Sequence, residues 1–255
     1  MAERTHVLAV VAAFALVFVL GVRTHGQNPP AGQASATPPT PRAAATVDLT
    51  GVWVSLITEN WRYRMVTPAR GDYQGVPMTA AAIKVADAWD PAKDDAAGLQ
   101  CRSYGAPAIM HVAGRIRISW QDDRTLKLET DNGMQTRLFR FEGGPAARPG
   151  RRTWQGDSVA RWESGGRGRG AVGSLRVVTT NFLAGYLRKN GVPYSENAGL
   201  TEYLDVAPIP GGQVLVATVV IDDPVYLDRQ FVVASQFKKE PDSSKWDPAP
   251  CSSTW

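Results

Sequence analysis

Glu202 is the carboxylate whose neighbours in the sequence most clearly indicate a special environment. In an extended strand it shares one face with Leu200 and Leu204. If that face lines a barrel, an ionised glutamate needs a partner, or its pKa must rise. Arg137 offers that partner because it alternates in the same way with Phe139. We predict a Glu202–Arg137 pair that either orients a polar group of a largely apolar ligand or serves as a structural salt bridge.

Acid–base catalysis is a second use for the same groups. If the strand register is shifted by one residue, Tyr203 and Asp205 face inward in place of Glu202. His111 follows an apolar triplet on a predicted strand, where a lone histidine is more often a structural residue than a base. The candidate catalytic residues are Glu202, Arg137, His111, Tyr203 and Asp205, and the chemistry they suit is that of an isomerase, lyase or hydrolase.

A second group of side chains suited to binding lies at Trp61, Arg62 and Arg64, with Tyr73 following in a glycine-rich loop. Aromatic rings supply stacking surfaces, and guanidinium groups supply fixed hydrogen-bond donors. The same combination also occurs at ordinary barrel rims. The predicted ligand-binding residues are Trp53, Trp61, Arg62, Arg64, Tyr73, Trp120, Arg137, Phe139 and Glu202.

The histidine count limits metal chemistry. The 255 residues include three histidines, and His6 and His25 lie in an apparent leader, which leaves His111. Motifs that need two histidines or a cysteine cluster are therefore excluded. Asp122-Asp123 and Asp222-Asp223 lack the alternating oxygen ligands of a calcium loop, and the chain has no phosphate loop or dinucleotide fingerprint. We expect neither a metal nor a cofactor.

The N-terminal pattern indicates export. Arg4 precedes the apolar run 7–20, which is shorter than the roughly 20 residues of a membrane span and fits a signal peptide. We predict a signal peptide or N-terminal anchor at 1–26, a flexible Pro/Ala-rich linker at 27–46, and one folded domain at 47–255. The protein is then periplasmic or secreted, with no stable membrane span unless the leader is uncleaved.

The charge and the cysteines agree with this location. Three of the 28 basic residues and one of the 24 acidic residues precede residue 43, which leaves a net charge of only +2. That balance does not indicate a nucleic-acid partner. Cys101 and Cys251 most simply form one disulfide in an exported protein, with two free thiols as the alternative.

Period-two alternation predicts mainly β structure. Asp131-Asn132-Gly133 is a hairpin signal between two of the strands, and residues 79–89 predict one short helix with an apolar stripe of Ala82, Val85, Ala86 and Trp89. Residues 142–170 read as a long hairpin with loose loops. The fold class is a single antiparallel β-barrel or strongly curved sheet, similar to lipocalins and calycins. The predicted strands are 50–58, 115–120, 126–129, 134–141, 175–182, 201–206, 214–221 and 230–238.

Two resemblances accompany this pattern. The Gly51-Val52-Trp53 triplet resembles the Gly-x-Trp start of lipocalins, in which the tryptophan closes one end of a ligand-holding barrel. The C-terminal half resembles a family of exported bacterial β-rich proteins without an established activity, which implies export and a sheet-rich fold and no catalytic residues. Its matching segments are VTTNF (178–182), LRKNGVPYS (187–195), LTEY (200–203), DDPVY (222–226) and FKKEPD (237–242).

The leading hypothesis is a secreted or periplasmic β-barrel protein that binds a small, largely apolar or aromatic molecule. One alternative is a metal-free and nucleotide-free envelope enzyme, and another is a structural or interaction module. An enclosed pocket lined by Glu202, Arg137 and aromatic rings favours the first two hypotheses, whereas a filled interior favours the third. The pattern specifies neither the ligand nor the oligomeric state.

Overall fold

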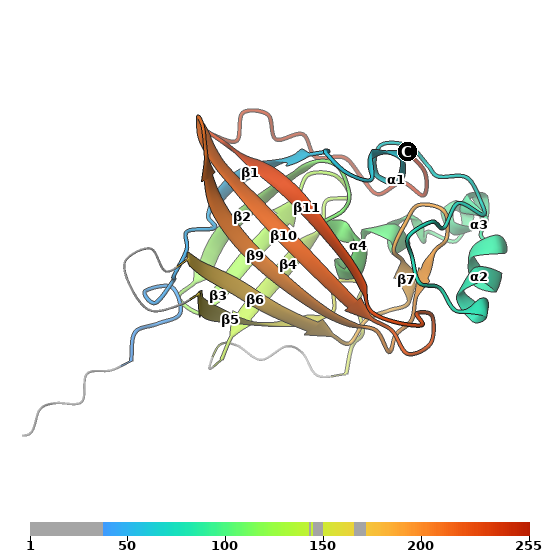
Figure 1. Cartoon of the computed structure of the whole chain (residues 1–255), viewed down its shortest axis with the longest axis horizontal. Helices are drawn as coiled ribbons and strands as arrows, with labels where there is room; N and C mark the ends of the chain where they lie inside the picture. Colours follow the sequence, from blue (N-terminus) through green and yellow to red (C-terminus); the bar gives the residue numbers. More distant parts are fainter. Residues whose placement is uncertain (1–37, 143, 145–149, 166–171) are drawn as a thin grey trace, which may run out of the picture. The chain divides into compact units, whose positions relative to one another are not determined.

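The computed structural model describes residues 38–142, 144, 150–165 and 172–255. Residues 39–255 form one compact unit built around a closed β-barrel (Figure 1). The predicted leader and most of the predicted linker lie outside the described residues. Around the barrel the strands follow the order β1-β11-β10-β9-β6-β5-β4-β3-β2, and β1 closes the ring by pairing with both β11 and β2. The predicted barrel class is therefore confirmed.

Eight of the nine barrel strands overlap the eight strands predicted from the sequence. The β2–β3–β4 meander forms as predicted, and Gly133 adopts a φ of +83° in the β3–β4 hairpin. The barrel strands are β1 (Gly51–Leu56), β2 (Arg115–Asp122), β3 (Thr125–Thr130), β4 (Thr136–Phe141), β5 (Asp157–Gly165), β6 (Val172–Thr180), β9 (Gly199–Ile209), β10 (Gly212–Asp222) and β11 (Phe231–Glu240).

The ninth strand, β5, corrects the prediction for residues 142–170. These residues do not form a long hairpin, because β5 runs parallel to β4 and antiparallel to β6. A parallel neighbour requires the chain to return along the barrel before β5 begins. The alternation of Ser158, Ala160 and Trp162 toward the interior was present in the sequence but was obscured by the surrounding Gly and Arg residues.

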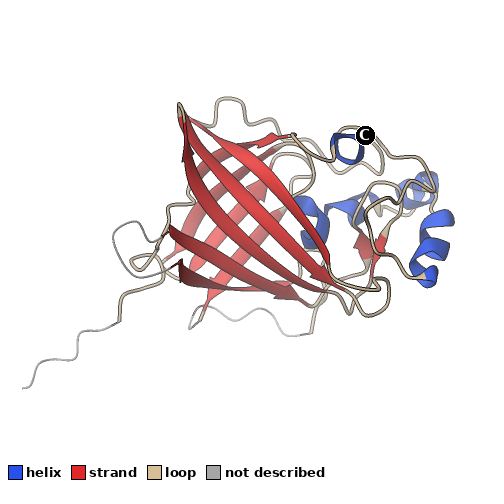
Figure 2. Cartoon of the chain, in the orientation of Figure 1, coloured by secondary structure: helices blue, strands red, loops and turns tan. Residues whose placement is uncertain are grey.

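Short helices gather at one end of the barrel, as Figure 2 shows. We call this region the cap; it consists of residues 57–113, the hairpin of β7 and β8, and the C-terminal residues 249–255. Its helices and strands are α1 (Trp61–Arg64), α2 (Ala80–Asp87), α3 (Pro91–Ala96), the 3-10 helix η1 (Gln100–Tyr104), α4 (Ala106–Ile109), β7 (Gly185–Tyr186) and β8 (Pro193–Tyr194).

Helix α2 is the predicted helix. The Thr79 side chain accepts a hydrogen bond from the Ala82 backbone N–H at 3.2 Å, as an N-cap residue does. Ala82 and Ala86 are buried, and Trp89 packs just beyond the helix end. Val85 does not belong to the buried stripe, because it is 37% exposed on the outer side of the helix.

The strand predicted around His111 is also wrong. Ala106–Ile109 forms helix α4, and His111 lies in the turn that follows it. Pro107 occupies the first turn of this helix, where a missing N–H costs no hydrogen bond. The short apolar run before His111 was compatible with either a strand or a buried helix. In the structure it forms a helix whose side chains pack into the end of the barrel.

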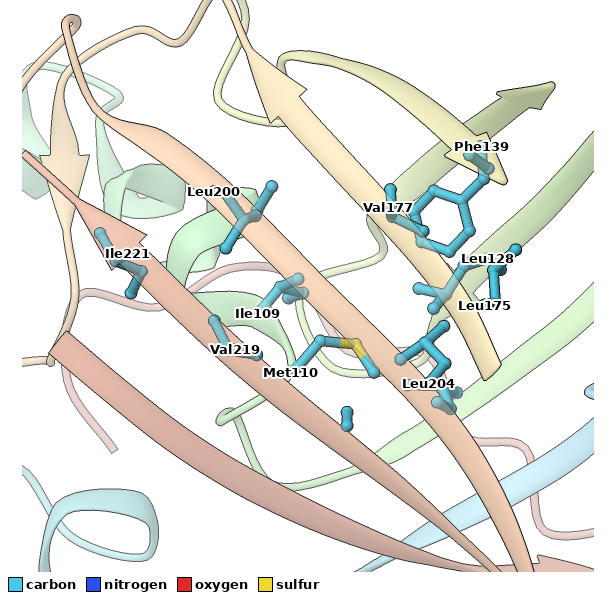
Figure 3. Packing of buried hydrophobic residues seen from close by; sticks show 14 of the residues in the cluster. Ile109, Met110, Leu128, Phe139, Leu175, Val177, Leu200, Leu204, Val219 and Ile221 are labelled. Carbon is cyan, nitrogen blue, oxygen red and sulfur yellow. The ribbon is translucent and has the colours of Figure 1, made fainter. Parts of the chain in front are cut away.

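Side chains fill the barrel interior. Trp53, Phe139, Leu204 and Phe237 are each fully buried. Helix α4 contributes Ile109 to this core from the cap end (Figure 3). These packed side chains occupy the space inside the barrel that a ligand would need.

One tight turn between β7 and β8 organises the cap. Arg188 donates to the Gln74 carbonyl at 2.8 Å, and Asn190 donates to the carbonyls of two further loop residues at 3.0 and 3.1 Å. Gly191 has a φ of +80°, and a Cβ there would lie 2.3 Å from the Trp89 Cβ. Only glycine combines that backbone conformation with such close packing. The side chains of Arg188, Lys189 and Asn190 are all buried.

Residues 251–255 are fastened to the rest of the cap by a disulfide and by hydrogen bonds. Cys101 and Cys251 form a disulfide across a sequence separation of 150 residues, as predicted. The Lys189 ammonium donates to the Ser252 carbonyl at 2.9 Å. Ser253 Oγ donates to Asp95 at 2.7 Å, which places the segment against α3. The disulfide thus joins η1 to the end of the chain.

We predict that the Cys101→Ser/Cys251→Ser double variant loses several kcal/mol of unfolding free energy. Closing a 150-residue loop contributes at most about 5 kcal/mol in the chain-entropy model. Urea denaturation of the double variant and of the reduced wild type checks this, and the two should unfold at the same midpoint. A double variant as stable as the oxidised wild type would contradict the prediction.

Candidate functional site

Among the described residues, one ion pair lies fully buried in the barrel interior. Arg137 Nη1 donates to Glu202 Oε1 at 2.8 Å, and Arg137 Nη2 donates to Oε2 at 2.5 Å. Nη2 also lies 3.3 Å from Thr179 Oγ1, which in turn lies 2.9 Å from Ser158 Oγ. The Arg137 guanidinium carbon lies 4.9 Å from the Phe139 ring centroid. Strands β4, β5, β6 and β9 thus contribute to one polar network.

Strand alternation places the pair inside the barrel. Arg137 is 1% exposed and Glu202 is 0% exposed. The structure therefore brings together the two residues that the sequence pattern pairs, and it settles the register in favour of Glu202. Tyr203 and Asp205 lie on the outward face of β9, where both are partly exposed.

The pair is arranged for structure more than for proton transfer. Both carboxylate oxygens of Glu202 accept hydrogen bonds from the same guanidinium, and the bidentate geometry is the strongest form of this contact. A general base needs an oxygen within reach of the substrate proton, and here both oxygens already face Arg137. Trp53 and Phe139, two of the predicted ligand contacts, likewise lie fully buried in the core.

His111 lies at the junction between the barrel and the cap. Its Nδ1 is 3.0 Å from Ser235 Oγ on β11, and its carbonyl accepts from Arg64 Nε at 2.9 Å. Burial lowers the pKa of His111 from 6.5 to about 3, and the charges of Arg64 and Arg188 add to this effect. The imidazole is therefore neutral near pH 7 and a weak base.

A hollow of about 360 Å³ opens on the outer surface of the cap, which we call the cap hollow. It is lined by Asn60, Trp61, Arg62, Tyr63, Gln74 and Gly75. Trp61 is 62% exposed, the largest exposed fraction among the large hydrophobic side chains described. Its position at the start of α1 holds the indole at the edge of the hollow.

Tyr63, which we call the floor of the cap hollow, is fixed by contacts with neighbouring charged side chains. The Arg188 guanidinium lies 3.9 Å from the Tyr63 ring centroid, within cation–π distance, and Tyr63 Oη donates to Asp72 at 3.0 Å. Arg62 forms an ion pair with the same aspartate. The Tyr63 side chain is therefore held from below and at its tip, while Trp61 beside it is exposed.

The remaining predicted contacts are distributed over the molecule. Arg64 is buried and pairs with Glu59 at 3.1 Å, and Tyr73 donates to Asp87 at 2.7 Å. Trp120 packs on Phe141 at the barrel end opposite the cap, with 5.6 Å between ring centroids. Of the predicted ligand-binding residues, only Trp61 and Arg62 line the cap hollow.

Two of the residues that shape this hollow escaped the sequence reasoning. Gln74 lines it, and Arg188 supports its floor from a turn more than 100 residues away in the chain. Arg188 lies within the LRKNGVPYS segment that carries the family resemblance, but that segment has no recognisable binding motif. The contact with Tyr63 depends on tertiary packing.

Comparisons with known proteins add no assignment, since no family model, curated protein or solved structure matches the chain. Among the described residues, no helix is both long and apolar enough to cross a bilayer. The same part of the chain holds no cluster of three or more histidine, cysteine or acidic side chains placed to bind a metal ion. The assignment of function therefore rests on the geometry of the hollows.

We predict that Glu202→Gln lowers the unfolding free energy by about 3–5 kcal/mol, because it leaves the Arg137 charge buried without compensation. The double variant Arg137→Met/Glu202→Leu, which replaces both charges with apolar groups, should lose much less. Urea unfolding of the two variants measures the difference. If Glu202→Gln is as stable as the wild type, the structural role of the pair is contradicted.

We also predict that His111 makes the fold sensitive to acid. Its folded pKa, about 3, lies below the 6.5 of the unfolded chain, so stability is complete above 6.5 and is lost as the pH falls toward 3. The slope from this one group is at most about 1.4 kcal/mol per pH unit. His111→Gln should flatten the stability profile just below pH 6.5, where few carboxylates titrate. An unchanged slope would show that His111 does not contribute.

Proposed function

We propose that this chain is an exported β-barrel protein that binds a small aromatic molecule in the cap hollow. The observation that carries the proposal is the highly exposed Trp61 indole at the edge of a 360 Å³ hollow with an immobilised tyrosine. Export is supported by the N-terminal sequence pattern and by the disulfide, which persists in oxidising compartments.

The exposed Trp61 indole lies beside a concave surface. Large apolar side chains exposed beside a concave surface are typical of binding sites. Trp61 offers a free ring face, whereas Tyr63 is held by Arg188 and by Asp72. A flat ring that stacks on Trp61 gains dispersion contacts without first ordering the floor of the site.

Arg62 supplies the polar contact of this site. Its guanidinium is half-exposed and lies 5.1 Å from the Tyr63 ring centroid. Arg62 pairs with Asp72, and its half-exposed guanidinium keeps further N–H donors for a ligand oxygen. The site thus suits an aromatic ring with one hydroxyl or carbonyl oxygen, and the hydrogen bond to that oxygen sets its orientation.

The filled interior argues against a ligand chamber inside the barrel. Trp53, Arg137, Phe139 and Glu202 occupy that space with their own side chains. The enzyme alternative has less support than binding, because the Glu202 oxygens are both engaged and His111 is a weak base. The binding surface is therefore sought on the outside of the molecule.

We predict that phenol binds saturably to the folded protein and that Trp61→Ala weakens this binding about tenfold, the equivalent of one stacking contact. Heteronuclear NMR of the indole N–H groups locates the site, because the Trp61 resonance should show the largest shift on adding phenol. Cyclohexanol, which matches phenol in size but lacks the ring face, should bind more weakly.

Trp246→Ala is the matched control, since this partly buried tryptophan packs on Arg117 and does not line the cap hollow. It should leave phenol binding unchanged. Equal binding of phenol to the wild type and to Trp61→Ala, or shifts confined to other tryptophans, would overturn the proposed function.

A further inference from the structure

A second hollow, of about 390 Å³, lies in the barrel wall between β4 and β5, and we call it the lateral hollow. It shares no lining residue with the cap hollow. It is lined by Thr136, Arg137, Leu138, Arg140, Arg151, Thr153, Gln155, Gly156 and Asp157. Its volume is in the range of small-molecule sites.

The hollow exists because two strands separate. The parallel pairing of β4 with β5 begins only at Phe139 opposite Ser158, so the β4 segment 136–138 pairs with β3 but has no described partner toward β5. Gly156, with a φ of +59°, lets the chain approach the end of β6. A Cβ at this position would lie 2.4 Å from the Thr180 carbonyl oxygen.

The charges around the lateral hollow favour an anion. Arg140 and Arg151 line it, and neither forms an ion pair with a carboxylate in the described part of the chain. Arg137 is balanced by Glu202, so these two arginines outweigh the one carboxylate of the lining, Asp157, by one charge. Guanidinium groups are well suited to bind a carboxylate in two-pronged geometry.

The carboxylate of Asp157 in the lining favours a ligand that carries hydrogen-bond donors. Asp157 accepts from Asn181 Nδ2 at 2.8 Å and can accept further hydrogen bonds. Gln155 Nε2 donates to the Tyr104 carbonyl at 2.8 Å and to Gln135 Oε1 at 2.9 Å, which orients the amide and leaves its Oε1 buried without a partner. Because that oxygen has almost no accessible surface, Asp157 is the acceptor that a ligand in the hollow can reach.

We propose that the lateral hollow binds a sugar acid, meaning a small carboxylic acid with several hydroxyl groups. Its carboxylate pairs with Arg140 and Arg151, and its hydroxyl groups donate to Asp157. Inorganic phosphate meets the same arginines, but it lacks this array of hydroxyl donors and is repelled by Asp157. The combination of cations and acceptors therefore separates a hydroxylated acid from a simple anion.

Titration calorimetry of the whole folded chain with D-glucuronate tests the proposal, with D-glucose and inorganic phosphate as comparison ligands. Glucuronate should bind more tightly than either. Arg140→Gln and Arg151→Gln should each weaken glucuronate binding about tenfold or more, since each removes one charge-assisted contact. Asp157→Asn should weaken glucuronate binding and strengthen phosphate binding.

Arg161→Gln is the control, because Arg161 is an exposed arginine on β5 that pairs with Glu163 and does not line the hollow. It should leave glucuronate binding unchanged, as should Trp61→Ala in the cap hollow. The absence of saturable glucuronate binding would overturn the proposal, as would phosphate binding as tight as glucuronate binding, or equal losses in Arg161→Gln and Arg140→Gln. Thermal melting verifies that each variant is folded.

Discussion

The two hydrogen bonds between Arg137 and Glu202 constrain the whole barrel. They join β4 to β9 across the interior, although β5 and β6 lie between these strands in the sheet. Two buried charges are tolerated only when each compensates the other and the geometry is maintained. The strands that carry them must therefore remain at a defined separation. The hydrophobic side chains around the pair then fill the interior, so that ligands are expected at the outside of the barrel.

The cap depends on a second buried cation. The Lys189 ammonium donates to Tyr104 Oη at 2.6 Å and lies 3.7 Å from the Trp255 ring centroid, and burial lowers its pKa to about 8. Its neighbour Arg188 supports Tyr63 at the floor of the cap hollow. One turn therefore fastens the C-terminal segment on one side and the cap hollow on the other, which gives the irregular loops of the cap a fixed arrangement.

Much of this organisation was readable in advance, and the reasons differ from element to element. The Arg137–Glu202 pair was predictable because each charge interrupts a run of inward-facing hydrophobic residues at period two. The disulfide was predictable because the chain has two cysteines and an export pattern. His111 was misplaced because a three-residue apolar run does not distinguish a strand from a buried helix. Strand β5 was obscured because its alternation is embedded between stretches rich in Gly and Arg.

The sequence by itself determined which side chains share a face of each strand, because alternation is a local property of an extended chain. It also predicted a barrel or a strongly curved sheet, and it favoured a disulfide between the two cysteines. Only the tertiary structure decided that the interior is filled, since packing depends on residues from every strand and from α4. Both hollows were likewise decided by long-range contacts. Arg188 reaches Tyr63 from a distant turn, and Gly156 draws the start of β5 toward β6 and away from β4.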